Sequence, residues 1–339
     1  MFSGVKILIL RRGSGNCGNV TTADRLRNYL LEVGIKCECV DTRCFNPKEC
    51  QNFDAVIAIH AYHCAPILKE CLVPYLIIFG GTDLNEYSRD QKCFGIMTNV
   101  ICKANNLITF GSSMTQKVFH LWPNICKERI NEIPQAVYTN PSRFNLKNYL
   151  DKNYNILVDK IFLLVLGVRR VKDPLFLVKD FSEWHDKHRD CWMIIIGSKM
   201  EDDYFQEVSE NISRARGILL LPQLPQHDVH ATMRDSFAVI NCSQSEGMCS
   251  SILEAMDLYV PVIARDIPGN RDLIEDRVTG LLYKTPKEFL NAAEELMNDH
   301  SLKNILIENA KQQINRKHLC STESKLYLEL IHSMLSETS

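Results

Sequence analysis

The sequence predicts an α/β protein with two Rossmann-like, doubly wound domains that face each other across a cleft. Its 339 residues are many for one hydrophobic core and suit two α/β domains. Short apolar segments alternate with amphipathic ones along the whole chain, as parallel strands joined by helices do. One polar, irregular stretch over residues 138–160 interrupts this alternation and divides the strands into two sets.

The first set contains short apolar strands, and one of them, at residues 37–41, is expected from the alternation of Cys37 and Cys39. We expect these strands at residues 6–10, 37–41, 55–59, 75–79 and 107–110, with a short one near 130–133. Leu26, Tyr29, Leu30 and Val33 recur at helix spacing. We therefore expect a helix over residues 22–33 that packs on the first strands.

The second set of strands is apolar without interruption, which is typical of parallel sheets covered on both faces. We expect these strands at residues 161–166, 192–196, 218–221, 237–240, 262–264 and 280–283. In such sheets ligands bind at the carboxyl ends of the strands. We therefore expect a ligand-binding site at the carboxyl ends of these strands.

Four parts of the chain follow from this pattern. They are an N-terminal domain (1–140), a linker (141–160), a C-terminal domain (161–318) and a C-terminal helix (319–339). Leu326, Leu328, Leu330 and Met334 are expected to pack that helix on one of the two domains. The oligomeric state is left open.

Composition excludes several classes of protein. The formal net charge is −2 with no long basic run, so nucleic-acid binding is not expected. No apolar run suits a signal peptide or a membrane span, so we expect a cytoplasmic protein without a transmembrane segment. Fourteen cysteines occur without zinc-site spacing, and reduced thiols are the simplest interpretation.

Residues 241–283 carry the strongest functional signal. Glu246 follows an apolar strand, Glu254 lies in a helix that opens near Ser250, and a Pro-Gly turn comes later. This order presents carboxylates and a helix N-terminus to one crevice, which suits a polyol that carries a phosphate. By spacing alone, two glutamates eight residues apart are ordinary surface residues, so the context carries the hypothesis.

This segment resembles the signature of family 4 (group 1) retaining glycosyltransferases, which have the GT-B fold of two Rossmann-like domains. The matching residues are Glu246-Gly247, Glu254-Ala255, Val260-Pro261-Val262, Asp266 to Gly269, Glu275-Asp276 and Gly280-Leu281-Leu282. The resemblance extends more loosely over both domains. It implies transfer of a sugar from a nucleoside-diphosphate sugar to an unknown acceptor, with no metal and no cofactor other than this co-substrate.

The resemblance also implies roles for single residues. Glu254 matches the glutamate that binds the ribose hydroxyls, and Glu246 matches the catalytic-site glutamate against the transferred sugar. Main-chain N–H groups that meet sugar and phosphate are those of Gly247, Met248, Cys249 and Ser250. The family often has proline where this chain has Ser251, which is a departure within the loop.

Cations for the diphosphate are expected after the first strand of the second domain. The family places an arginine and a lysine there, and residues 167–173 occupy that position with a shorter spacing. We favour Arg169 with Lys172, and Arg170 is the alternative. Preorganised cations would stabilise the negative charge of the leaving group. The simpler interpretation is that these side chains surround the end of the strand and have no catalytic role.

Two further stretches of the second domain have expected roles. Leu221, in residues 220–224, matches the family stretch whose backbone contacts the nucleobase. The acidic residues 201–203 suit the first turn of a helix, so we expect no metal there.

The loop after the first strand is rich in glycine. Gly13, Gly15 and Gly18 have the G-x-G-x-x-G spacing, with Asp41 as a possible ribose partner, so an NAD-dependent oxidoreductase is an open alternative. The resemblance instead implies a loop that approaches donor phosphate and acceptor through Gly18 and Asn19.

Acceptor-side candidates lie at two other strand ends of the first domain. They are His60, His63 and Asp83, whose alternatives are structural histidines and a helix cap. Many family members have histidine where this chain has Gly80. This departure motivates a second alternative, a non-catalytic relative that binds a nucleotide sugar or glycan without transferring it.

Overall fold

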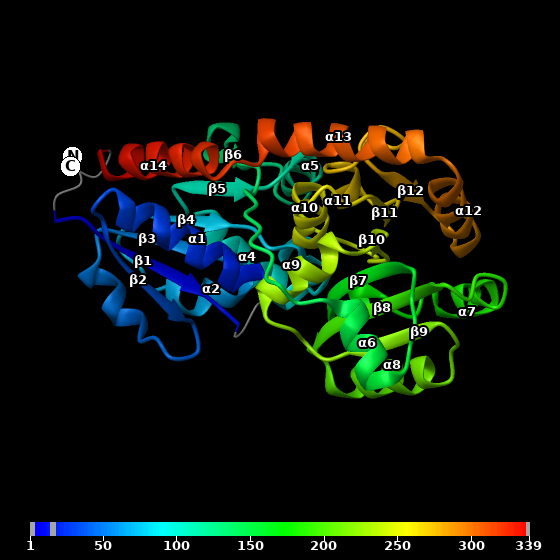
Figure 1. Ribbon diagram of the computed structural model, residues 1–339. Helices are drawn as coiled ribbons and strands as arrows, with labels where there is room; N and C mark the ends of the chain where they lie inside the picture. The colour runs from blue at the N-terminus through cyan, green and yellow to red at the C-terminus, as the bar shows by residue number, and fades with distance from the viewer. Residues whose placement is uncertain (1–3, 14–17, 337–339) are drawn as a thin grey trace. The chain divides into compact units, whose positions relative to one another are not determined.

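The computed structural model describes residues 4–13 and 18–336. It divides into two compact units, Met1–Ala136 with Cys320–Ser339, and Val137–Leu319. Each unit contains one six-stranded sheet with helices around it (Figure 1). All the strand pairs are parallel, so the predicted α/β class is confirmed.

The sheet of the first unit has the order β2-β1-β3-β4-β5-β6. Its strands are β1 Lys6–Arg11, β2 Lys36–Asp41, β3 Ala55–Ile59, β4 Tyr75–Ile78, β5 Asn106–Thr109 and β6 Ile130–Glu132. The α-helices are α1 Gly18–Glu32, α2 Ala61–Leu68, α3 Gly81–Asn85, α4 Gln91–Ile101 and α5 Ser112–Leu121. Short 3₁₀ turns are η1 Pro47–Asn52, η2 Tyr87–Arg89 and η3 Lys127–Arg129. All five residues of β3 are buried, as expected for a strand covered on both faces.

Helix α1 begins at Gly18, four residues before the expected start at residue 22. Leu26, Tyr29 and Leu30 are buried, which confirms most of the predicted stripe. Val33 does not belong to it, because the helix ends at Glu32 and Val33 is 41% exposed.

The sheet of the second unit has the order β12-β11-β10-β7-β8-β9. Its strands are β7 Lys160–Val168, β8 Cys191–Lys199, β9 Ile218–Leu221, β10 Ala238–Asn241, β11 Val262–Arg265 and β12 Leu281–Tyr283. The helices are α6 Leu146–Tyr154, α7 Val178–His185, α8 Asp202–Ser213, α9 Gln226–Arg234, α10 Ser250–Asp257, α11 Pro268–Arg271, α12 Pro286–Asn298 and α13 His300–Lys317, with η4 at Arg170–Lys172.

Two hydrophobic clusters cover the two faces of this second sheet. Phe162 and Leu164 belong to one cluster, whereas Ile161 and Leu163 belong to the other. Successive side chains of a strand point to opposite faces, so β7 contributes to both clusters. Its burial on both sides explains why the strand is apolar without interruption.

The stretch expected to be an irregular linker, residues 141–160, contains helix α6. Leu146 and Leu150 are buried in the core of the second unit. The Asn145 side chain caps the helix start by accepting the Asn148 N–H, and Asn155 ends it with a left-handed φ of 54°. The prediction of irregular structure was wrong because only one apolar pair at i, i+4 marks this short helix.

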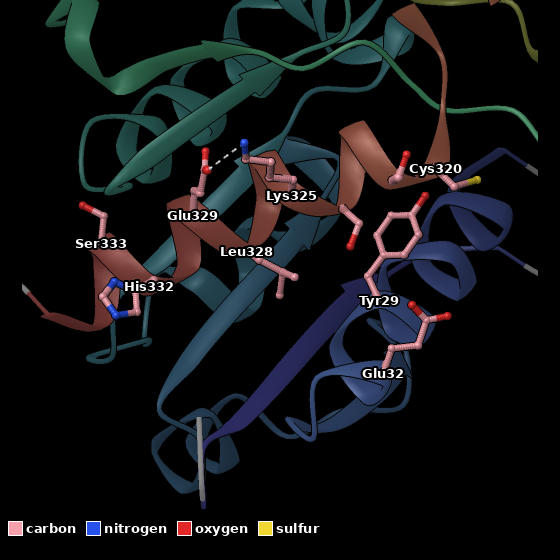
Figure 2. A pocket seen from close by; sticks show the side chains of 10 residues that line it. Tyr29, Glu32, Cys320, Lys325, Leu328, Glu329, His332 and Ser333 are labelled. Carbon is pink, nitrogen blue, oxygen red and sulfur yellow. Dashed lines mark ion pairs between the residues drawn. The ribbon is translucent and has the colours of Figure 1, made fainter. Parts of the chain in front are cut away.

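Helix α14, Cys320–Ser336, belongs to the first unit. Its buried residues are Glu323, Tyr327, Ile331 and Met334. Met334 is buried as expected, whereas Leu326, Leu328 and Leu330 are only half-buried. Residues two apart point to nearly opposite sides of a helix, so Leu328 cannot share a face with Leu326 and Leu330. Leu328 instead lines a groove with Tyr29 of α1 and Lys325 of α14 (Figure 2).

A buried carboxylate fastens α14 to α1. Glu323 is 1% exposed and accepts bonds from Arg25 Nη2 at 2.9 Å, Arg25 Nε at 2.5 Å and the Tyr29 hydroxyl at 2.8 Å. Burial, followed by the neighbouring Glu323 charge, raises the pKa of Tyr29 above its ordinary value. The phenol therefore stays a neutral donor, and the cluster ties chain segments 298 residues apart.

Glu323→Gln should lower the free energy of unfolding by about 3 kcal/mol, because it leaves the Arg25 guanidinium buried without its counter-charge. Urea denaturation followed by circular dichroism measures this change. Glu329→Gln is the matched control, because Glu329 and its partner Lys325 are 61% and 76% exposed on the same helix. The control should stay within about 0.5 kcal/mol of the parent chain, and an equally small effect of Glu323→Gln would contradict the role given to the cluster.

Candidate functional site

Lys172 and Glu246 form a buried ion pair at the carboxyl ends of two adjacent strands. Lys172 ends η4 after β7, Glu246 follows β10, and these strands pair in parallel. The Lys172 Nζ lies 2.6 Å from both carboxylate oxygens of Glu246. The two side chains are 17% and 7% exposed. The structure thus brings together two residues that the sequence analysis selected separately.

Neutral donors complete the environment of Glu246. Ser243 Oγ donates to Oε1 at 2.6 Å and Asn241 Nδ2 at 3.2 Å. Burial alone raises the pKa of Glu246, but the Lys172 ammonium and these hydrogen bonds outweigh it, so the pKa lies below its ordinary value. Both carboxylate oxygens are therefore engaged and the group is held ionised.

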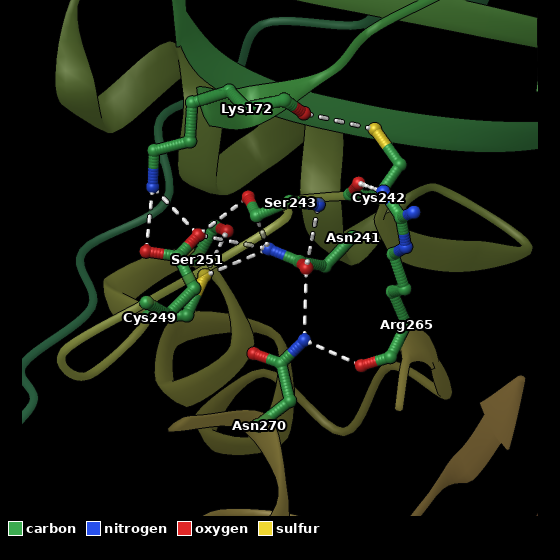
Figure 3. A network of polar contacts seen from close by, with 9 residues as sticks. Lys172, Asn241, Cys242, Ser243, Cys249, Ser251, Arg265 and Asn270 are labelled. Carbon is green, nitrogen blue, oxygen red and sulfur yellow. Dashed lines mark hydrogen bonds and ion pairs between the residues drawn. The ribbon is translucent and has the colours of Figure 1, made fainter. Parts of the chain in front are cut away.

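The Pro-Gly turn expected near the site packs directly on the Glu246 loop. A Cβ atom at Gly269 would lie 2.5 Å from the carbonyl oxygen of Glu246, so only glycine fits. The next residue, Asn270, is fully buried and donates through Nδ2 to Asn241 Oδ1 at 2.9 Å. The turn after β11 thus supports the same asparagine that supports Glu246 (Figure 3).

A second ion pair, which the sequence analysis missed, fixes the loop that carries Lys172. Asp173 follows η4 with a left-handed φ of 47°, and its Oδ2 accepts from Arg265 Nη1 at 2.9 Å. The same Arg265 atom donates to the Cys242 carbonyl at 3.1 Å, and the guanidinium lies 3.8 Å from the Phe176 ring centroid. Arg265 therefore joins the loop after β7 to the end of β10.

The two arginine candidates for the diphosphate differ in their surroundings. Arg170 is 65% exposed, and its Nη2 lies 3.3 Å from Glu207 Oε2 with the guanidinium over the Tyr204 ring. Arg169 is half-buried, and its guanidinium has no hydrogen-bond or ion-pair partner among residues 4–13 and 18–336. Arg169 is thus the arginine of this loop that is available to an anionic ligand.

Glu254 lies outside the network of Glu246 and has its own partners. It sits in α10, which begins at Ser250 as expected. Its Oε1 accepts from Gln226 Nε2 at 3.0 Å, and His230 Nε2 lies 3.8 Å away from the same oxygen. The other oxygen, Oε2, has no hydrogen-bond partner in the described part of the chain. Unlike Glu246, Glu254 keeps one carboxylate oxygen for a ligand.

Main-chain roles were expected for Gly247, Met248, Cys249 and Leu221. Met248 packs against the core, and Cys249 and Leu221 belong to it with 5% and 1% exposure. Asn241 Nδ2 also lies 3.3 Å from Cys249 Sγ. These three side chains are directed inward, so only backbone atoms of these residues are suited to meet a ligand.

In the first unit, Asp83 is a fully buried capping carboxylate. It accepts backbone N–H groups of Ala61 at 2.9 Å, Tyr62 at 3.1 Å and Gly80 at 2.9 Å. His60 Nδ1 lies 2.7 Å from Asp83 Oδ1, the oxygen that also accepts from Tyr62. Burial raises the pKa of Asp83, but His60 and the backbone donors together bring it below its ordinary value. Asp83 orders the backbone here and is closed to solvent.

His60 is held in a strained conformation beside Gly80. Its φ is 83°, a left-handed value that is unfavourable for a residue with a side chain. Its Nε2 lies 2.6 Å from Thr82 Oγ1, and the residue is 2% exposed. A Cβ at Gly80 would lie 2.9 Å from His60 Cδ2. The His60 ring therefore occupies the space next to the position at which many family members carry histidine.

His63 is the more exposed histidine of this pair. Its ring stacks on His60 at 4.1 Å, and its Nδ1 lies 3.4 Å from Arg12 Nη1. Burial, with the neighbouring His60 and Arg12, lowers the pKa of His63 to about 4. Tyr62 and Tyr87 stack on each other at 4.3 Å and present ring edges to His63.

The glycine-rich loop is described only in part, because Gly15 lies outside the described residues. Gly18 and Asn19 open helix α1, and Asn19 Nδ2 donates to the Arg12 carbonyl at 3.3 Å. Asp41 is occupied by Arg43, whose Nη2 and Nε each lie 2.9 Å from one of its oxygens. This pairing, with burial acting against it, lowers the pKa of Asp41. A carboxylate paired in this way is poorly prepared to receive the ribose of a dinucleotide.

The acidic residues 201–203 form a helix terminus, as predicted. Helix α8 begins at Asp202, with Glu201 as its N-cap residue. Within residues 4–13 and 18–336, no three His, Cys, Asp or Glu side chains cluster as a metal site would require. Over the same residues, no helix combines the length and apolarity needed to cross a bilayer.

Solved structures share the arrangement of the strands and helices. A structure of HepE from Anabaena with UDP-glucose superposes with a TM-score of 0.81 at 16% identity, covering 97% of this chain and 99% of that one. Sucrose-phosphate synthase from Thermosynechococcus elongatus gives a TM-score of 0.77 at 12% identity over 99% of this chain and all of the other. These likenesses confirm the expected GT-B fold.

Sequence comparison identifies the family. The profile of glycosyl transferases group 1 matches residues 148–313. Glycosyltransferase 1 domain-containing protein 1 of Xenopus tropicalis is 35% identical over 338 residues, 96% of this chain and 97% of the relative. Alpha-D-kanosaminyltransferase of Streptomyces kanamyceticus is 28% identical over 48% of this chain and 42% of its own length. Because one relative is this similar over nearly its full length, the chain belongs to the group 1 family of glycosyltransferases.

Proposed function

We propose that this protein is a retaining, metal-independent glycosyltransferase that moves a sugar from a nucleoside-diphosphate sugar to an acceptor. The observation that carries the proposal is the set of charges at the carboxyl edge of the second sheet. There the Arg169 guanidinium has no partner among the described residues, Lys172 pairs with Glu246, and Glu254 Oε2 likewise has no partner among those residues. Cations and a hydroxyl acceptor on one edge suit a ligand that carries both diphosphate and ribose.

Cationic side chains would hold one part of the donor and a carboxylate would hold another. Arg169 and Lys172 would meet the diphosphate, and Glu254 would accept the ribose hydroxyls. Lys172 is already paired with Glu246, so a bound diphosphate would compete with the Glu246 carboxylate for the Lys172 ammonium. Binding of the donor would therefore change the contacts of the Glu246 loop, which would lie against the transferred sugar.

Cleavage of the sugar–phosphate bond builds negative charge on the departing diphosphate. Arg169 and Lys172 would stabilise that charge without reorganisation, which favours the transition state over the ground state. The transition state would resemble an oxocarbenium ion. Glu246 is bound by Lys172 through both oxygens and is thus a poor nucleophile. The acceptor would therefore attack from the side of the departing diphosphate, whose oxygen takes the acceptor proton.

Thermal unfolding with UDP, GDP, ADP, their sugars and NAD, all with EDTA, tests this function. One nucleoside diphosphate should raise the melting temperature, because a ligand at 100 times its dissociation constant adds about 2.7 kcal/mol of stability. Glu254→Gln should weaken that ligand about tenfold, since a neutral amide accepts hydroxyl protons less strongly than a carboxylate. Glu295→Gln, which alters a half-buried carboxylate paired with Arg277 on another part of the unit, is the control and should leave the affinity unchanged.

Other outcomes of this experiment separate the alternatives. A shift with NAD alone would favour the oxidoreductase. Binding of a nucleotide sugar without its hydrolysis or transfer to any acceptor would favour the non-catalytic relative. That alternative rests on Gly80, which stands where many family members have histidine. No shift with any nucleotide would overturn the proposed donor site.

Arg169→Ala and Lys172→Ala should each lower kcat about 100-fold with a smaller change in KM, because their charge acts mainly on the transition state. Steady-state release of nucleoside diphosphate measures both constants. Arg170→Ala should remain near the activity of the parent chain, because Arg170 already pairs with Glu207 in solvent. A larger loss in Arg170→Ala than in Arg169→Ala would reverse this assignment.

For the acceptor we propose the surface around His63, with buried His60 and Asp83 ordering the backbone beneath it. His63 should remain neutral through physiological pH, because its burial and the neighbouring His60 and Arg12 lower its pKa to about 4. Its folded pKa lies below the unfolded value of about 6.5, so its protonation favours unfolding as the pH falls from about 6.5 towards 4. An NMR titration of the ring protons measures this pKa, and a value near 6.5 would contradict the burial of the ring.

A further inference from the structure

We propose that Gln226 and His230 are positioning residues that aim Glu254 at the ribose of the donor. This inference rests on the proposed function, because it assigns a purpose to the partners of the residue expected to bind ribose. Gln226 is the first residue of α9 and His230 lies four residues later, so the two share one face of that helix. Neither residue belongs to the motifs found in the sequence.

The contacts fix the position of the His230 ring. The side chain is 6% exposed, and its Nδ1 accepts the backbone N–H of Asn140 at 3.0 Å. Its Nε2 lies 3.0 Å from the Gln226 Nε2 that donates to Glu254 Oε1. The same Nε2 lies 3.8 Å from Glu254 Oε1, which is beyond hydrogen-bond distance. Gln226 is thus the donor to the carboxylate, and His230, anchored through Asn140, packs against the Gln226 amide.

This arrangement treats the two oxygens of Glu254 differently. Oε1 is bound by Gln226 at 3.0 Å with His230 behind it, whereas Oε2 has no partner among the described residues. A carboxylate held through one oxygen does not rotate freely, so the other oxygen keeps a fixed direction. Such orientation lowers the entropy lost when a ligand binds. Glu246 has no such asymmetry, because Lys172 contacts both of its oxygens.

A cycle that combines a variant with a modified ligand tests the inference. The probe is whichever of UDP, GDP and ADP the parent chain binds most tightly, together with its 2′,3′-dideoxy form. Loss of the ribose hydroxyls should weaken binding to the parent chain about tenfold. In Gln226→Leu and in His230→Phe this penalty should fall to about threefold or less, since Glu254 is no longer aimed at the hydroxyls. Isothermal titration calorimetry gives the four dissociation constants of each cycle.

Gln206→Leu is the matched control. Gln206 makes the same kind of bond, from Nε2 to Glu210 Oε1 at 3.1 Å, on the exposed face of α8. This control should keep the full penalty for the dideoxy ligand. A variant that only loosened the fold would weaken both ligands equally and leave the penalty unchanged, which would overturn the inference while the proposed function stands. If the parent chain binds none of the three diphosphates, the proposed function fails and this inference fails with it.

Discussion

The buried ion pair of Lys172 and Glu246 is the constraint around which the second unit is arranged. Removing two charges from water costs several kcal/mol per ion, so such a pair persists only when further polar groups surround it. Ser243 and Asn241 supply hydrogen bonds, and Asn270 supports Asn241 in turn. Three strand ends, those of β7, β10 and β11, are thereby fixed to one another before any ligand arrives.

Buried carboxylates serve a comparable purpose in the first unit, with different partners. Asp83 gathers three backbone N–H groups and His60, which orders the ends of β3 and β4. Glu323 gathers Arg25 and Tyr29. In each case an acceptor with several lone pairs joins segments that are distant in sequence, as no neutral side chain of similar size would. Differences in solvent access then separate these structural acids from Glu254.

The sequence predicted the twelve strands found in the described residues, most of them from uninterrupted apolar runs, which are distinctive in parallel sheets. It missed α6, where Leu146 and Leu150 are the buried residues, and in α14 it selected three leucines that are only half-buried. In the site, Glu246 and Lys172 were selected separately. Their pairing joins residues 74 apart in the sequence, so no local sequence pattern could predict it. Gln226 and His230 escaped notice because polar residues on a short helix ordinarily face solvent. Arg265 and Asp173 were likewise not selected, because only the folded structure shows that they pair.

The order of the two units along the chain has a consequence for how the protein is made. Residues 137–319 form one unit as a continuous insertion, while the first unit needs Cys320–Ser339 to be complete. During synthesis the second unit can therefore close as soon as it leaves the ribosome. The first unit must wait with the α1 surface uncovered until α14 has been translated, which follows the whole of the second unit in the chain. Any early stop before Cys320 would release a chain whose second core is whole and whose first core lacks its final helix.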